Sequence, residues 1–144
     1  MLICLLYYAP LQAAGLNTDF STVTLDDLKV GGTYRTGEMI NLPLKVENTG
    51  SEPVDLTMEV LSPQDSELKE GFEPIPQISW IKLQKSEFKD VMPNAFAVTD
   101  VIVSIPRDNQ YKSKQYQVFI WTHTVGKMVS IGLKSKLLLK IKNE

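Results

Sequence analysis

The sequence contains one cysteine and one histidine, and this scarcity excludes several kinds of chemistry. Cys4 lies in the apolar opening segment, so the remaining chain has neither a disulfide nor a thiol centre. Because His123 stands alone, metal sites with two histidines and most nucleophile–base pairs are excluded. Phosphate-binding glycine loops and the G-x-S-x-G pattern are absent as well. We therefore predict a protein that is not an enzyme and has no metal or cofactor.

Acidic residues form three small groups that raise the question of a calcium site. The groups are Asp26 with Asp27, Glu67 with Glu70 and Glu73, and Glu87 with Asp90. A calcium loop needs six or more oxygen ligands at defined spacing and a turn glycine. None of the groups has the D-x-D-x-D-G pattern, so we interpret them as solvated surface charge.

Positive charge is scarce in most of the chain and concentrated at its end. The 15 basic and 17 acidic residues give a net charge of −2, which argues against nucleic acid as the main partner. Residues 127–144 contain five lysines and one acid, which leaves 10 basic and 16 acidic groups elsewhere. An acidic body with a basic final segment is compatible with an anionic polymer or an acidic protein surface as partner.

The first 14 residues are apolar and uncharged. The run MLICLLYYAP, followed by Ala13 and Ala14, is typical of the hydrophobic region and cleavage zone of a secretory signal peptide. Basic residues that usually precede such a region are missing, and an apolar first strand is the alternative. The stretch is shorter than the ~20 residues of a membrane-spanning helix. We predict that residues 1–14 are a signal peptide or an apolar terminal segment. Residues 15–144 are predicted to form one domain that is exported to the periplasm, cell surface or extracellular space.

Apolar and polar residues alternate through most of the chain, and turns rich in glycine, proline and asparagine separate the alternating segments. The pattern predicts strands over 19–25, 39–48, 54–61, 78–83, 86–95, 96–106, 115–123 and 128–142. Residues 62–77, with three prolines, are predicted to be a long loop. No stretch has a helical period. Short, regularly spaced strands predict an all-β fold, an Ig-like antiparallel β-sandwich of seven or eight strands.

The segment 39–48 alternates most clearly. Ile40, Leu42, Leu44 and Val46 are expected to face inward. Pro43 has no N–H to donate to a ladder, so we expect an edge or a bulge at that point.

The segment 115–123, QYQVFIWTH, is apolar on both faces. If Val118 and Ile120 face the core, then Phe119, Trp121 and His123 lie on the outer face of the sheet. Aromatic residues on an outer face are typical of contact surfaces. The alternative is that the loop 62–77 or the N-terminal segment covers them.

The final segment contains lysines at even positions and mostly aliphatic residues at odd positions. The lysines are Lys134, Lys136, Lys140 and Lys142, and the expected core set is Val129, Ile131, Leu133, Leu137, Leu139 and Ile141. We interpret the lysines as the solvent-exposed face of a strand, where they discourage edge-to-edge aggregation. A basic face that binds an anionic partner is the alternative.

Two aromatic residues are expected to be structural. Trp80 lies between isoleucines at 78 and 81, which favours a place in the core. Tyr116 follows the polar turn 107–114 at the start of a strand, a position like that of the tyrosine corner in Ig-like sandwiches.

The order of these segments resembles that of bacterial Ig-like sandwiches. A strand ending in VENTG is followed by a second strand, a loop that reaches Trp80, and a strand ending in Ile105-Pro106. The turn RDNQYKSK, the strand YQVFIW and the lysine-rich strand complete the order. Over residues 19–142 the chain is similar to the N-terminal domain of periplasmic pilus-assembly chaperones and to related envelope Ig-like domains. It has room for one such domain where those chaperones have two, and their basic pair for a partner's carboxylate is not recognisable.

These observations favour a non-catalytic exported module of the bacterial envelope or surface. Its partners would be proteins, including further copies of itself, or an anionic cell-wall polymer. The resemblance implies an alternative, an assembly-chaperone-like protein that holds a partner by β-strand addition.

Overall fold

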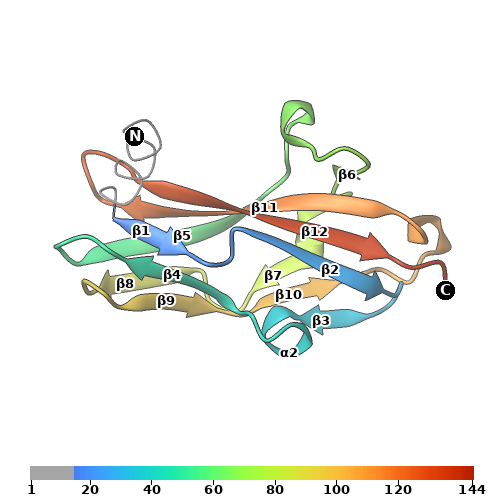
Figure 1. Cartoon of the computed structure of the whole chain (residues 1–144), viewed down its shortest axis with the longest axis horizontal. Coiled ribbons are helices and arrows are strands. Elements are labelled where there is room, and N and C mark those ends of the chain that lie inside the picture. Colours follow the sequence, from blue (N-terminus) through green and yellow to red (C-terminus); the bar gives the residue numbers. More distant parts are fainter. Residues whose placement is uncertain (1–14) are drawn as a thin grey trace, which may run out of the picture.

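The computed structural model describes residues 15–144, which form two layers of β-strands (Figure 1). The predictions for Cys4 and for residues 1–14 therefore lie outside the described residues. The first layer is one sheet in the order β2 (Thr22–Leu28), β12 (Gly132–Ile141), β11 (Gln115–Val125), β5 (Val54–Leu61) and β8 (Glu87–Val91), with β6 (Glu73–Pro74) beside β11. The second layer contains β1 (Leu16–Thr18), β4 (Leu44–Asn48) and β9 (Phe96–Thr99), and separately β3 (Thr33–Arg35), β10 (Val101–Ser104) and β7 (Ile81–Leu83). The predicted all-β, Ig-like sandwich is confirmed.

The strands are shorter and more numerous than predicted: the predicted strand 96–106 is divided into β9 and β10, and the short strands β1 and β3 lie outside the predicted ones. β1 and β2, β3 and β4, β7 and β8, and β9 and β10 each follow one another with a short interruption. In two of these pairs the chain changes layer: β1 pairs with β4 whereas β2 pairs with β12, and β7 pairs with β10 whereas β8 pairs with β5. These segments therefore connect the two layers through the continuous chain.

The core lies between the layers and is filled by alternate side chains of their strands. Leu25, Val46, Val101, Ile120 and Leu139 are fully buried there. Alternation explains this placement because successive strand residues point to opposite faces.

An aromatic cluster packs at one end of the core. The ring of Trp80 meets Tyr111 edge-on at 4.8 Å and Tyr116 at 5.5 Å between ring centroids. Trp80 is 4% exposed and Tyr116 is 5% exposed, and burial raises the pKa of the Tyr116 hydroxyl. Both residues thus lie in the core, and the ring of Tyr116 contacts Trp80.

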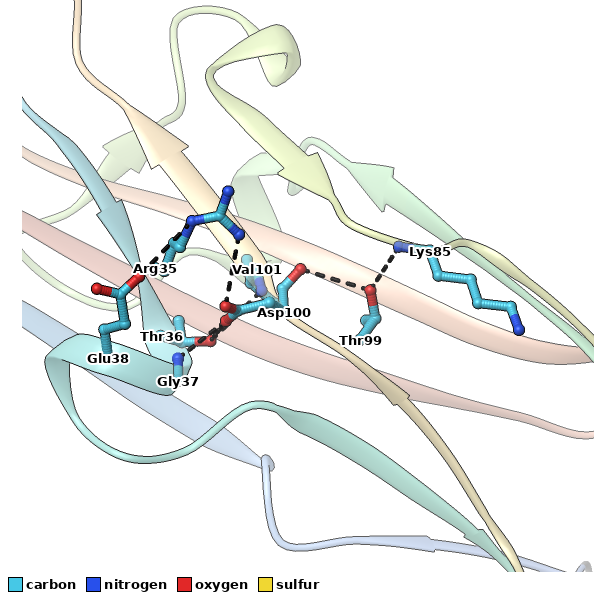
Figure 2. A network of polar contacts seen from close by, with 8 residues as sticks. All are labelled: Arg35, Thr36, Gly37, Glu38, Lys85, Thr99, Asp100 and Val101. Carbon is cyan, nitrogen blue, oxygen red and sulfur yellow. Dashed lines mark hydrogen bonds and ion pairs between the residues drawn. The ribbon is translucent and has the colours of Figure 1, made fainter.

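A polar network lies where the second layer divides into its two sheets (Figure 2). Asp100 separates β9 from β10, and its carboxylate accepts hydrogen bonds from the backbone N–H of Gly37 at 2.9 Å and from the hydroxyl of Thr36 at 3.3 Å. The guanidinium of Arg35 lies 3.7 Å from the same carboxylate. The network therefore connects the segment between β3 and β4 with Asp100, the residue between β9 and β10.

The prediction for residues 39–48 is wrong in its first half. The four-residue helix α2 (Thr36–Met39) interrupts the strand, and the backbone carbonyl of Thr36 accepts hydrogen bonds from the N–H groups of Ile40 and Leu42. Ile40 is 37% exposed instead of inward. Pro43 precedes β4, the central strand of its sheet, so it marks neither an edge nor a bulge.

The final strand also begins later than predicted. Residues 126–131 form the turn between β11 and β12, in which Met128 is fully exposed and Val129, expected in the core, is 73% exposed. Leu137, Leu139 and Ile141 are buried as expected.

Other segments differ in smaller ways. Residues 78–83 combine the 3-10 turn Ile78–Trp80 with β7, and the predicted loop 62–77 contains the 3-10 turn Asp65–Glu67 and β6. Among the residues that the structure describes, no helix has the length and apolar character needed to cross a bilayer.

Candidate binding surfaces

The first half of β12 is paired on one side only. β12 pairs antiparallel with β11 over residues 132–140, but its parallel pairing with β2 starts at Lys136. Within residues 15–144, no strand pairs with residues 132–135 on the β2 side. The reason is that the preceding strand β1 lies in the other layer, and the chain crosses over at residues 19–21. We call residues 132–135 the open edge.

A hollow of about 290 Å³ lies at this end of the sandwich, beside the turn that leads into the open edge. Leu16, Val54 and Ile131 contribute apolar walls, and Lys127 and Glu52 contribute charges of opposite sign. Gly15, the first described residue, also lines the hollow.

Exposed apolar side chains surround the hollow. Met128 is 104% exposed, Val129 is 73% exposed and Val125 is 44% exposed, and the first two line the hollow. Grouped apolar exposure of this kind marks contact surfaces in soluble proteins. We call the hollow, the turn 126–131 and the open edge together the open corner. Sequence reasoning placed Val129 in the core and therefore missed this surface.

The three residues of the predicted aromatic contact face lie on the outer face of the first layer. Phe119 is 6% exposed because side chains cover it: the Lys134 ammonium lies 4.9 Å from its ring centroid and 2.7 Å from a carboxylate oxygen of Glu67. Trp121 and His123 are half-buried. The three side chains therefore share a face but differ in how much of them a partner can reach.

The loop 62–77 covers part of this outer face. Gln117 is fully buried under it, and its side-chain amide donates to the Glu67 carbonyl at 2.9 Å and accepts from the Lys69 N–H at 2.8 Å. A hydrogen bond from the Gln64 backbone and the Lys134 ammonium lower the pKa of Glu67. Phe72 and Leu138 are buried here too, away from the main core. Along the first half of β11 the core covers the inner face and the loop 62–77 covers the outer face. This explains why the sequence of β11 is apolar on both faces.

Trp121 and His123 form what we call the aromatic platform. The indole of Trp121 lies on Gly132, where a Cβ atom would overlap the ring. The two rings are 24° from parallel, with centroids 5.5 Å apart. His123 Nε2 lies 2.6 Å from Glu59 Oε2 on the neighbouring strand β5. The alternating pattern places the rings on one face, but Gly132 and Glu59 carry no signal in the sequence for these contacts.

The four lysines of the predicted basic strand face are unequally engaged. Lys134 pairs with Glu67, and Lys142, which follows β12, lies 3.6 Å from Glu144. For Lys136 and Lys140 no ion pair is formed within residues 15–144. Part of the basic charge is thus neutralised within the chain, and an anionic partner for this face stays a prediction.

Within residues 15–144 no group of three or more histidine, cysteine, aspartate or glutamate side chains could hold a metal ion. His123 is adjacent to one carboxylate, that of Glu59. The expectation that the protein is not an enzyme stays a prediction.

No family model and no curated protein matches the sequence. Solved structures do match. A PapD-like (ASH) domain of human CEP192 has a TM-score of 0.65 at 13% identity, covering 92% of this chain and 89% of that one. The fold is that of the PapD-like, Ig-like sandwiches. The Escherichia coli chaperone DraB matches with a TM-score of 0.56 at 15% identity, covering 89% of this chain and 55% of DraB.

A putative carbohydrate-binding protein from Bacteroides ovatus matches with a TM-score of 0.59 at 12% identity, covering 89% of this chain and 37% of that one. The predicted resemblance to chaperone domains is thereby confirmed for the fold. This chain spans about half of DraB, and one PapD-like sandwich serves proteins with different roles, so the fold does not name the activity.

Proposed function

We propose that this protein is a non-catalytic binding module that holds a partner protein by β-strand addition at the open corner. The observation that carries the proposal is the one-sided pairing of residues 132–135 beside an apolar hollow. A strand that continues the line of β2 would find free backbone groups along the open edge and apolar side chains next to them.

Backbone hydrogen bonds and buried apolar side chains contribute different amounts to the free energy of this binding. A backbone hydrogen bond contributes about 0.5–1.5 kcal/mol net, so the few bonds that residues 132–135 can form give weak binding by themselves. Burial of an exposed apolar side chain contributes about 1.5–3 kcal/mol. Met128 and Val129 therefore supply the larger share, and the open edge sets the register of the partner.

The setting we propose is the bacterial cell envelope or surface, based on residues 1–14, whose composition fits a signal peptide. The fold does not bear on location, because it also occurs in a human protein. An assembly-chaperone-like role is a narrower form of the same proposal, favoured by the likeness to DraB and by the open edge. A chaperone would release its partner to an assembly, whereas a surface module would keep it.

Site-specific cross-linking in the source cell tests the proposal. Cys4 is the only cysteine, so Val129→Cys in a Cys4→Ser background provides a single thiol for a photo-cross-linker. The matched control is Val98→Cys, since Val98 is a 45% exposed valine on the outer side of β9. We expect a discrete protein adduct from position 129 that is lost when Met128→Asp is added. Equal adducts from both positions, or none from position 129, would contradict the proposal.

A further inference from the structure

We propose that the aromatic platform binds an uncharged sugar of a polysaccharide or glycan. The platform shares Gly132 with the open edge, but its ligand would lie on the outer face of the sheet, away from the hollow and the turn 126–131. The platform is Trp121 and His123 on β11, with Gly132 of β12 below the indole and Glu59 of β5 at its side. It lies on the outer face of the first layer, whereas the hollow of the open corner opens between the layers.

Gly132 is the feature that makes the platform flat. In the antiparallel register Gly132 lies opposite His123, two pairs along from Trp121, and its missing side chain lets the indole lie on the backbone. An indole that lies on a sheet directs its other face away from that sheet. The imidazole of His123 stacks against the indole at 24° from parallel, with the ring centroids 5.5 Å apart, so the two rings form one aromatic group. Sugars pack their C–H faces on aromatic faces presented in this way.

Polar groups beside the rings suit the hydroxyls of a sugar. The side chain of Glu59 is 53% exposed, and its bond to His123 uses one carboxylate oxygen, Oε2. Lys134, opposite Trp121 in the register, is 39% exposed and donates to Glu67. A few convergent polar groups around an apolar surface fix the orientation of a small ligand.

The charges around the platform favour an uncharged ligand. Glu59 faces His123 and Lys134 faces Glu67, so each charged side chain next to the rings already has a polar partner in the chain. An anionic polymer would gain little here, because Lys134 already pairs with Glu67 and the other charged side chain, Glu59, is acidic. A phosphate or uronate would find stronger attraction at Lys136 and Lys140, outside the platform.

The limited apolar area favours a sugar over a protein. The centre of a protein interface is a contiguous apolar patch enclosed by a polar rim. Here Phe119 is covered by the Lys134–Glu67 pair, so two half-buried rings remain, with Glu59, Thr57 and Lys134 across the strands beside them. This pattern of small apolar surfaces next to hydrogen-bonding groups matches the surface of a pyranose.

The test uses soluble neutral glycans: hydroxyethylcellulose, laminarin and galactomannan in affinity gel electrophoresis, and an N-acetylglucosamine tetramer in calorimetry. We expect the wild-type chain to bind at least one of them, with polygalacturonate as a weaker anionic comparison. Trp121→Ala should weaken that binding by about tenfold or more, as expected for truncation of a central aromatic anchor. Trp121→Phe keeps a ring and should lose less.

Gly132→Ala is the sharpest variant, because it keeps Trp121 in the chain but forces its ring off the sheet. We expect it to weaken binding as much as Trp121→Ala does. Met128→Asp, in the open corner, is the control and should leave glycan binding unchanged while it abolishes the cross-link from position 129. Thermal melting of each variant confirms that it is folded. The two proposals can therefore fail separately.

Several outcomes overturn the inference. They are no binding of the wild-type chain to any of these glycans at millimolar sugar concentration, tighter binding to polygalacturonate than to all neutral glycans, or equal binding by folded Trp121→Ala. Loss of the cross-linked protein adduct in Trp121→Ala with no glycan binding would identify the platform as part of the protein contact instead.

Discussion

The two ends of the sandwich differ in how the core is closed. At one end Trp80, Tyr111 and Tyr116 pack edge to face, and β2 covers the last residues of β12. At the other end the hollow opens between the layers, and the first residues of β12 have no second paired strand in the described chain. Tyr116 and Thr124 mark these ends on the same strand, β11, about 27 Å apart at ~3.4 Å per residue. A single strand thus passes from a closed core to an open one.

The polarity of the core changes along the same strand. Tyr116, Val118 and Ile120 are followed on the inner face by Thr122 and Thr124. The hydroxyls of Thr122 and of Ser135 are buried without a hydrogen-bond partner in the part of the chain that the structure describes. A buried unpaired polar group costs about 1–3 kcal/mol. The two ends therefore differ in core polarity as well as in packing.

The largest effect is expected at the closed end. Trp80→Ala removes the ring that joins Tyr111 and Tyr116 and should lower the free energy of unfolding by about 3–5 kcal/mol. Urea denaturation followed by circular dichroism measures it. Met128→Ala at the open corner is the control, and we expect a change within about 0.5 kcal/mol, because its side chain is fully exposed. Similar losses for both variants would break the comparison between the ends.

A smaller effect is expected at the boundary between the two sheets of the second layer. Asp100→Ala leaves the Gly37 N–H and the Thr36 hydroxyl without their acceptor and should cost about 1–3 kcal/mol of unfolding free energy. Asp100→Asn keeps one acceptor oxygen and should cost less. Hydrogen exchange should show faster opening in both β9 and β10. A change confined to one of these strands would mean that the network serves one sheet only.

The smallest effect should stabilise the protein. Thr122→Val replaces an unpaired buried hydroxyl by a methyl group of similar volume and should raise the free energy of unfolding by about 1 kcal/mol. Thr124→Val is the matched control, since the Thr124 hydroxyl accepts a hydrogen bond from the N–H of Ile131 at 3.0 Å. We expect that variant to lose about 0.5–1.5 kcal/mol. Equal signs for the two variants, read from denaturant midpoints, would show that hydroxyl pairing does not distinguish the positions.

The sequence was sufficient for the fold but only partly for the surfaces. Alternation revealed β5, β11 and most of β12, because a period of two follows from strand geometry alone. The break before β4 was missed since it depends on Asp100, more than sixty residues away in the chain. No sequence pattern within residues 36–43 indicates the contact with Asp100.

The candidate surfaces show the same limit. Spacing placed Phe119, Trp121 and His123 on one face, but it could not show that Glu67 and Lys134 cover Phe119. The open edge arises from the crossing of the chain at residues 19–21, which is a property of the topology. The turn 126–131 looked like strand because its apolar residues continue the alternation of β12 without being in it.

The parallel pairing of β2 with β12 has a consequence for how the chain reaches this state. Thr22 of β2 pairs with Lys136 of β12, so β2 can join the first layer only after β12 is available, more than a hundred residues later in the chain. Contacts between such distant positions carry a large loop-closure cost and slow folding. During synthesis, β2 has no partner strand in the first layer until the lysine-rich strand β12 has emerged. Completion of the sandwich therefore depends on the arrival of β12.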